Sequence, residues 1–166
     1  LSVIALTYAL GVDVEDIHQA IAKFHGVAHR LERIRTLHGV TYYNDSKATN
    51  TDSTIKALES FTSPLVLIAG GKDKMTDLEE MMELVKTNVK ELILIGEAAQ
   101  RFAEAAVKVG VPHIHRCESM EEAVSLSARI AEDGDVVLLS PACASFDWYA
   151  RFEDRGDHFR RLVERL

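Results

Sequence analysis

The sequence is poor in cysteine, in basic residues and in long apolar segments. Its two cysteines, Cys117 and Cys143, are too few for a disulfide framework and fit a reducing cytoplasm. No apolar run approaches the roughly 20 residues that a membrane-spanning helix needs, and there is no signal peptide. The formal net charge of -7 argues against a general nucleic-acid binder, which would present a basic face. We therefore expect a cytoplasmic protein with no membrane span and no nucleic-acid partner.

Motifs for binding triphosphates and metals are also missing. The chain has neither a GxxGK(S/T) phosphate loop nor a GxGxxG fingerprint, so a triphosphate, if the protein uses one, must be held elsewhere. His25 and His29 stand four residues apart, and His113 and His115 two apart, but neither pair has a third ligand in reach. We therefore predict no metal site. The chain opens on an apolar segment with neither methionine nor helix cap, and we interpret it as a piece of something longer.

What the chain does have is an alternation of strand and helix patterns. Four continuous apolar runs indicate strands buried on both faces: residues 65–69, 92–95, 111–115 and 136–139. A β-hairpin precedes them, with a turn at His38-Gly39 and a second strand from Val40 to Asn44. Helical patterns between the runs predict a mostly parallel sheet with helices on both faces. The expected fold is therefore α/β and Rossmann-like, with an N-terminal β-hairpin strand.

Helix boundaries are marked by capping residues and glycines. Capping boxes that begin at Thr76 and at Ser119 predict two helix starts, and Gly110 predicts a helix end. Two apolar helical patterns precede the hairpin, within residues 1–27. We therefore expect this pair of helices to be separate from the alternating part of the chain.

A dense polar stretch, residues 43–50, includes the end of the second hairpin strand. It contains an acid, a base, two hydroxyls and two carboxamides. In a sheet of this kind, ligands bind beyond the carboxyl ends of the strands. Several helix-capping residues end the stretch, so we expect backbone N–H groups to converge there on an anion. The alternative is a polar connection with more capping residues than it needs.

Two further loops are expected at the same edge of the sheet. Residues 70–74 combine glycines, which let backbone approach a ligand, with lysines, although any single lysine can be ordinary surface charge. Residues 140–145 are small, which leaves room for a ligand against the following backbone amides. Cys143 lies in this loop without a fitted base, and we interpret it as a packing residue rather than a nucleophile.

The motifs at these loops resemble those of the Mur ligase family. Four stretches carry the resemblance: Asn44-Asp45-Ser46-Lys47-Ala48-Thr49-Asn50, Gly70-Gly71 with Lys74, Ser140-Pro141-Ala142-Cys143-Ala144-Ser145-Phe146-Asp147, and Phe152-Glu153-x-Arg155-Gly156-x-x-Phe159. The resemblance covers essentially the whole chain. It implies that residues 28–166 are the family's C-terminal, amino-acid-binding domain and that residues 1–27 are the last helices of its central ATPase domain. The chain departs from the family pattern at Lys72-Asp73, where a glycine-rich form is expected, and at Phe146, where leucine is common.

Among family members, the motifs are most similar to those that join D-glutamate to UDP-N-acetylmuramoyl-L-alanine in peptidoglycan synthesis. The resemblance implies that ATP phosphorylates the terminal carboxylate of UDP-N-acetylmuramoyl-L-alanine and that the amine of D-glutamate attacks the acyl phosphate. ATP and Mg²⁺ are the implied cofactors, with the phosphate loop and the metal site in the central domain. The 166-residue chain alone is therefore expected to be inactive.

The resemblance also assigns site residues. Arg30 and Asp45 would contact the nucleotide, and Lys47 would help to neutralise phosphate charge during catalysis. D-glutamate would be held by Thr49, Lys74, Ser145, Phe146 and Phe152. The two carboxylates of D-glutamate need a cation and converging donors, which these loops offer. The alternative is a stand-alone Rossmann-like ligand-binding module without catalysis, because a fold alone does not determine a function.

Overall fold

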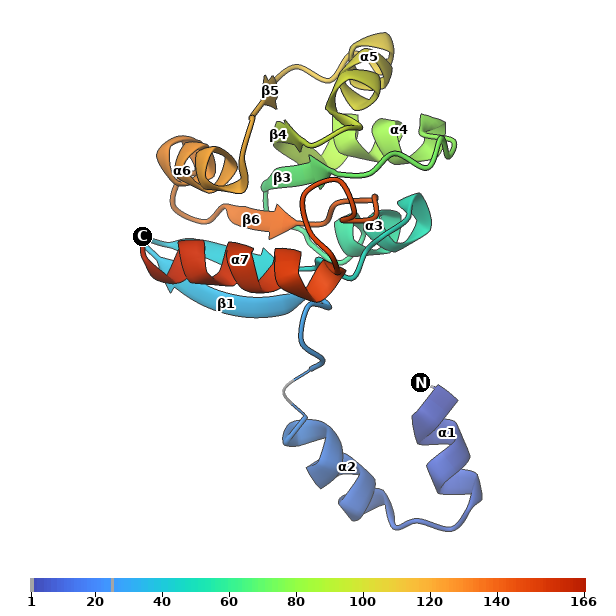
Figure 1. Cartoon of the computed structure of the whole chain (residues 1–166). Coiled ribbons are helices and arrows are strands. Elements are labelled where there is room, and N and C mark those ends of the chain that lie inside the picture. The colour runs from blue at the N-terminus through green and yellow to red at the C-terminus, as the bar shows by residue number, and fades with distance from the viewer. Residues whose placement is uncertain (1, 25) are drawn as a thin grey trace.

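Helices and strands alternate through most of the chain in the computed structural model (Figure 1). The structure describes residues 2–24 and 26–166, so Leu1 and His25 lie outside the described residues. The elements are α1 (Ser2–Ala9), α2 (Val14–Ala22), β1 (Glu32–Leu37), β2 (Val40–Asn44), α3 (Thr51–Leu58), β3 (Leu65–Gly70), α4 (Glu79–Asn88), β4 (Val89–Ile95), α5 (Ala99–Val109), β5 (Ile114–Arg116), α6 (Met120–Ile130), β6 (Val136–Leu139) and α7 (Phe152–Glu164).

The strands form a six-stranded sheet in the order β1-β2-β6-β3-β4-β5. β1 runs antiparallel to β2, and the other neighbouring strands are parallel to each other. The hairpin turns at His38 and Gly39, whose φ angles are 49° and 79°. Positive φ at both positions suits a two-residue turn, whose twist then matches that of its strands. The predicted α/β fold, with its mostly parallel sheet and N-terminal hairpin, is confirmed.

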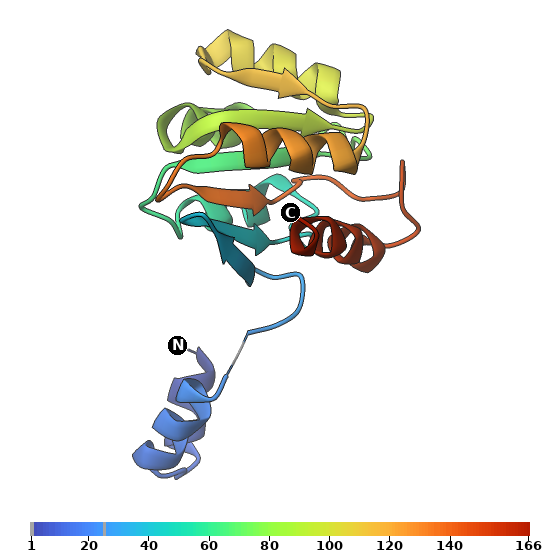
Figure 2. The same ribbon diagram turned by 90° about the vertical axis from the view of Figure 1, so that its left-hand side faces the viewer.

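Helices cover both faces of the sheet (Figure 2). On one face, α3, α4 and α5 bury a cluster that includes Leu58, Met82 and Phe102. On the other face, α6 and α7 bury a second cluster that includes Met120 and Phe159. Successive side chains of β3 and β6 point alternately into the two clusters. These strands are therefore buried on both faces, as their continuous apolar runs predict.

One strand departs from the prediction. Residues 111–115 do not form a strand that is buried on both faces. β5 covers Ile114–Arg116, lies at the edge of the sheet and is partly exposed. The physical reason is its place in the sheet order, since β5 is the last strand of the sheet in the described part of the chain and pairs with β4 alone.

Of the two helix starts predicted from capping boxes, the one at Ser119 is confirmed. Ser119 Oγ accepts a hydrogen bond from Glu122 N–H over 3.1 Å and caps α6 as predicted. The box at Thr76 was wrong. α4 begins at Glu79, and its N-cap residue is Leu78, whose side chain makes no cap hydrogen bond, while Glu79 N–H donates to Asp77 Oδ1 over 2.9 Å.

The two N-terminal helices stand apart from the sheet and its covering helices (Figures 1 and 2). Neither α1 nor α2 has a buried residue. Exposed apolar side chains on these helices include Val3, Leu6, Tyr8, Val14 and Ile21. No helix in the described part of the chain is long and apolar enough to cross a bilayer. The separation agrees with a boundary near residue 27, while the assignment of residues 1–27 to a neighbouring domain stays a prediction.

Candidate functional site

The three polar loops predicted from the sequence lie side by side beyond the carboxyl ends of three parallel strands. They are the β2 loop (residues 45–50), the β6 loop (residues 140–151) and the β3 loop (residues 71–78), and β2, β6 and β3 are consecutive parallel neighbours. From β3 the chain proceeds outward to β4 and β5, then returns through α6 to β6 on the other side of β3. Such a reversal opens a crevice beyond the carboxyl ends of the strands, where α/β proteins bind ligands. The crevice between these loops is therefore the candidate site.

The β3 and β6 loops are in direct backbone contact. Gly70 N–H donates to Pro141 O over 2.8 Å, and Lys72 N–H donates to Ala144 O over 2.9 Å. Gly71 has a φ of 137°, and a Cβ there would lie 2.4 Å from Ala144 O. The lack of a side chain at Gly71 thus permits the close approach of the β6 loop, while the predicted approach of a ligand to the paired glycines stays a prediction.

A single buried arginine joins the β2 and β6 loops. Arg155, from the first turn of α7, is 1% exposed, and its guanidinium donates to Ser46 Oγ, Ser46 O, Cys143 O and Ala144 O over 3.0–3.1 Å. The small residues of the β6 loop leave room, as predicted. Beside Cys143 and Ala144, however, the Arg155 guanidinium fills that room. Burial lowers the pKa of Arg155 to about 10, which still leaves it charged at neutral pH.

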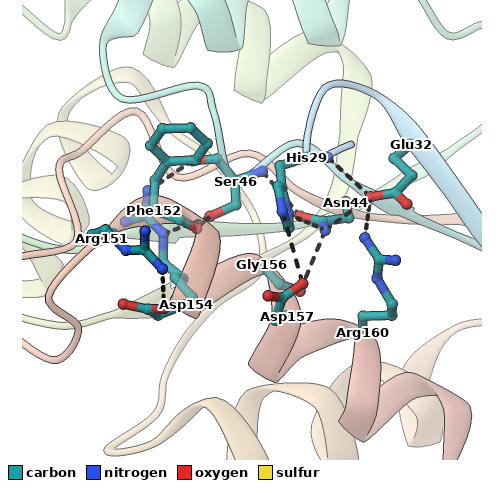
Figure 3. Close-up of polar contacts among 11 residues, drawn as sticks. His29, Glu32, Asn44, Ser46, Arg151, Phe152, Asp154, Gly156, Asp157 and Arg160 are labelled. Carbon is teal, nitrogen blue, oxygen red and sulfur yellow. Dashed lines mark hydrogen bonds and ion pairs between the residues drawn. The ribbon is translucent and has the colours of Figure 1, made fainter. Parts of the chain in front are cut away.

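A second set of contacts holds the start of the β2 loop against α7 (Figure 3). Asn44 Nδ2 donates to His29 Nδ1 over 3.1 Å and to Gly156 O over 3.3 Å, and Ser46 Oγ donates to Phe152 O over 2.7 Å. Glycine is needed at position 156, since a Cβ there would lie 2.3 Å from His29 Nδ1. α7 thus supports the β2 loop, and His29 belongs to a hydrogen-bond network.

Backbone N–H groups of the β2 loop bond to acceptors within the protein. Those of Lys47, Ala48 and Thr49 donate to backbone carbonyl oxygens over 2.9–3.0 Å. That of Ser46 donates to Asn44 Oδ1 over 3.1 Å. The N–H groups of residues 46–49 are therefore not free to bind an anion, while for the start of α3, residues 50–52, the predicted convergence on an anion stays a prediction. Side chains add positive charge at this loop.

Arg30, Asp45 and Lys47 line one pocket of about 420 Å³ beside α3. The carboxylate of Asp45 is buried and accepts hydrogen bonds from Leu31 N–H (3.2 Å) and from the hydroxyl of Ser140 (2.8 Å). Burial raises the pKa of Asp45, while both hydrogen bonds and the charge of Arg30 oppose the rise. Arg30 and Lys47 are exposed. The pocket thus combines an oriented acidic group with two accessible cations, which together can contact hydroxyls and anionic groups of one ligand.

The residues predicted to hold an amino acid lie on the loops around the crevice. Lys74 Nζ donates to Thr49 O over 3.0 Å, so the cation of the β3 loop lies beside the β2 loop. Lys47 Nζ lies 5.5 Å from the centre of the Phe152 ring, which is a cation–π distance. Ser145 is 1% exposed, and its Oγ has no hydrogen-bond partner within the described part of the chain. Such a buried hydroxyl costs free energy unless a ligand or water satisfies it.

Phe146 directly follows Ser145 in the β6 loop, and its side chain is 71% exposed, so its predicted contact with an amino acid stays a prediction. Cys143, in the same loop, is buried, and burial raises the pKa of its thiol to about 12. A thiolate nucleophile is therefore disfavoured at neutral pH, in agreement with a packing role. Among residues 2–24 and 26–166, no group of three histidine, cysteine, aspartate or glutamate side chains could hold a metal ion.

Two arginines at the site had no role assigned from the sequence. Arg155 shares a helical spacing of four with Phe159 and Val163, the buried stripe of α7, and this register could have marked it as buried. Arg101, on α5, donates from Nε and Nη2 to the carboxylate of Asp73 in the β3 loop, over 2.7 Å each. No local pattern could have shown this contact, because it depends on how α5 lies against the sheet.

Known proteins with similar sequences define the family. The family model described as Mur ligase, glutamate ligase domain matches residues 29–143. The UDP-N-acetylmuramoylalanine--D-glutamate ligase of Clostridioides difficile (strain 630) is 47% identical over 166 residues, which are 100% of this chain and 37% of that protein. The enzyme of the same name from Pelotomaculum thermopropionicum is 47% identical over 163 residues, which are 98% of this chain and 36% of that protein. The chain therefore belongs to the Mur ligase family.

Solved structures share the fold. UDP-N-acetylmuramate-alanine ligase MurC from Thermotoga maritima has a TM-score of 0.70 at 16% identity, over 98% of this chain and 35% of that one. MurF ligase from the same organism, in complex with ADP, has a TM-score of 0.60 at 19% identity, over 98% of this chain and 37% of that one. At such identities the similarity establishes the fold alone. The chain spans little more than a third of the length of its curated relatives.

Proposed function

We propose that this chain is the C-terminal part of a cytoplasmic, ATP-dependent ligase that joins D-glutamate to UDP-N-acetylmuramoyl-L-alanine in peptidoglycan synthesis. The Mur ligase family is ATP-dependent, and the curated relatives carry the name of a D-glutamate ligase. Their similarity extends over 98–100% of this chain. The chain's own contribution is to bind D-glutamate and to complete the nucleotide site.

The observation that carries the proposal is the placing of Lys74, Thr49 and Ser145 on adjoining loops at the reversal of strand order. D-glutamate brings two carboxylates, and each needs donors when it leaves water. The Lys74 ammonium has three N–H donors, of which Thr49 O accepts one. The Ser145 hydroxyl is buried and can donate to the ligand at no cost to a protein partner. Lys74 is assigned to the side-chain carboxylate of D-glutamate.

Arg30, Asp45 and Lys47 form the part of the nucleotide site that this chain supplies. Asp45 accepts from ribose hydroxyls, because its carboxylate is already oriented by Leu31 and Ser140. The exposed guanidinium of Arg30 binds phosphate or ribose, and Lys47 balances phosphate charge.

Bond formation follows from these roles. The amine of D-glutamate attacks the carbonyl carbon of the acyl phosphate, and the tetrahedral intermediate then releases phosphate as the amide forms. Holding the amine beside its target removes much of the entropic barrier. Phe152 contributes apolar surface beside D-glutamate. Lys47, which lies over the Phe152 ring, links Phe152 to the nucleotide pocket.

ATP's triphosphate and Mg²⁺ belong, in this proposal, to a central domain that residues 1–27 help to complete. The described residues do not fit a magnesium site, since they contain no group of three potential ligands. Residues 28–166 form the amino-acid-binding domain. Its sheet and both apolar clusters lie within that range.

Substrate dependence of the full-length protein tests the proposal. Phosphate release from ATP is measured with UDP-N-acetylmuramoyl-L-alanine and one amino acid at a time. We expect release with D-glutamate and little with L-alanine or a diamino acid. ATP turnover that is indifferent to D-glutamate would overturn the assignment. Binding of a small molecule without any ATP consumption would favour the stand-alone binding module instead.

A further inference from the structure

We infer that Arg101 is a positioning residue for Lys74 and, through it, for D-glutamate. The inference rests on the proposed function of Lys74. Residues 73–76 have neither helical nor strand structure. Arg101 holds both ends of this segment, because Nε and Nη2 donate to the Asp73 carboxylate over 2.7 Å each and Nη1 donates to Thr76 O over 3.0 Å. Lys74 lies between the two residues that a single guanidinium anchors.

The Asp73 carboxylate also shapes the backbone beyond Lys74. Asp73 Oδ1 accepts from Met75 N–H over 2.8 Å, which closes a turn around Lys74. Met75 has a φ of 56°, in the left-handed region that residues other than glycine adopt uncommonly. The turn therefore keeps an unfavourable backbone conformation, and the ion pair with Arg101 holds the carboxylate that closes it. From this turn, the Lys74 side chain reaches Thr49 O.

Arg101 also neutralises the carboxylate of Asp73, the residue that precedes Lys74 in the chain. The hydrogen bonds from Arg101 are the main cause of a lowered pKa for Asp73, so this carboxyl is ionised at neutral pH. The other cation of the loop, Lys72, already pairs with Glu97 over 2.7 Å. Within the described part of the chain, no carboxylate lies within ion-pair distance of Lys74. Without Arg101, the freed Asp73 would attract Lys74 and compete with a substrate carboxylate.

Steady-state kinetics of the full-length ligase test the inference. Arg101→Gln keeps a similar length and removes the charge. We expect the KM for D-glutamate to rise about 10-fold, while kcat and the KM for ATP change less than about twofold, because one misplaced cation weakens one substrate. Arg101→Lys keeps the charge without the bidentate geometry and is expected to fall between wild type and Arg101→Gln.

A double variant separates geometry from charge. Asp73→Asn is expected to raise the KM for D-glutamate less than Arg101→Gln does, since no free carboxylate remains beside Lys74. For the same reason, Asp73→Asn combined with Arg101→Gln should recover part of the loss caused by Arg101→Gln alone. A double variant that is as impaired as the sum of the single variants would overturn the electrostatic part of the inference.

Two controls make the result specific. Arg116→Gln removes the same charge from β5, where Arg116 contacts Gln100 rather than the β3 loop, and should leave every KM unchanged. In a Lys74→Ala background, Arg101→Gln should have no further effect on the KM for D-glutamate. Thermal unfolding of each variant confirms that the fold persists.

The possible failures are distinguishable. If Lys74→Ala leaves the KM for D-glutamate unchanged, the proposed function of Lys74 is wrong, whatever Arg101 does. If Lys74→Ala raises it but Arg101→Gln does not, only the positioning role is wrong. Equal increases in the KM for ATP and for D-glutamate in Arg101→Gln would also overturn that role, because they indicate a general disturbance.

Discussion

Arg155 and Ser46 are joined by two hydrogen bonds although 109 residues separate them in the chain. The guanidinium donates to both the hydroxyl and the carbonyl oxygen of Ser46, over 3.0 Å each. The same group reaches the carbonyl oxygens of Cys143 and Ala144. A buried cation bonded to neutral acceptors thus crosslinks two of the three loops that carry the candidate site.

Replacing Arg155 should destabilise the fold. Arg155→Met is expected to lower the free energy of unfolding by about 2–4 kcal/mol, because buried acceptors on both loops lose their donors. Denaturant unfolding of the 166-residue chain measures the change. Arg151→Met is the matched control, since the side chain of Arg151 is exposed and, among the described residues, bonds only to Asp154 of α7. Equal effects of the two substitutions would contradict a crosslinking role.

Removal of the N-terminal helices should leave the sheet intact. α1 and α2 bury none of their residues, and their exposed apolar side chains promote self-association. A chain lacking residues 1–25 is therefore expected to be folded and more monomeric than the whole chain. Size-exclusion chromatography and thermal unfolding measure the two properties. Loss of cooperative unfolding would instead show that these helices belong to the core.

The chain by itself should be catalytically inactive. It has no phosphate loop, and the described residues contain no metal-binding group. We expect the purified 166-residue chain to show no ATP hydrolysis and no product formation. Product is measured with all three substrates present, and a Lys47→Ala chain supplies the background. ATP-dependent ligation above that background would disprove the expectation.

Lys74 should decide how well D-glutamate binds. A charge-assisted hydrogen bond contributes about 1.5–3 kcal/mol, so Lys74→Ala in the full-length enzyme should weaken D-glutamate use roughly 10- to 150-fold. ATP use should change much less, and discrimination against D-glutamine should shrink, because the cation favours a charged acceptor. The measurement is steady-state kinetics with each substrate varied in turn. A raised KM for ATP with an unchanged KM for D-glutamate would assign Lys74 to the nucleotide.

Ser145→Ala provides a graded comparison in the same assay. A neutral hydroxyl bond contributes about 1 kcal/mol, so the loss of D-glutamate use should be about fivefold, smaller than that of Lys74→Ala. The Ser145 hydroxyl has no protein partner to leave unsatisfied within the described residues, so the unfolding midpoint should not fall when it is removed. A large loss of stability would show that the hydroxyl supports the fold rather than the ligand.

The sequence by itself determined the α/β class, the buried strands β3, β4 and β6, the hairpin and the three polar loops. These features are local, because apolar periodicity and turn residues act over a few neighbouring positions. The same locality leaves the helix starts ambiguous. Five consecutive residues, 49–53, could each cap a helix, and Asn50 does so by accepting from Ser53 N–H. Thr76 fits a capping box, yet its carbonyl accepts from Arg101, and Glu79 N–H donates to Asp77 rather than to Thr76.

Only the tertiary structure decided which of these loops meet. The order β2-β6-β3 arises because the chain returns from the far edge of the sheet to insert β6 beside β3. Because of that insertion, Ser46 and Cys143 lie close enough to accept hydrogen bonds from the same guanidinium. The insertion also leaves β5 as an edge strand, which is partly exposed. Arg155 and Arg101 have their partners on other elements, so their roles depend on the packing of α7 and α5, although the register of α7 could have marked Arg155 as buried.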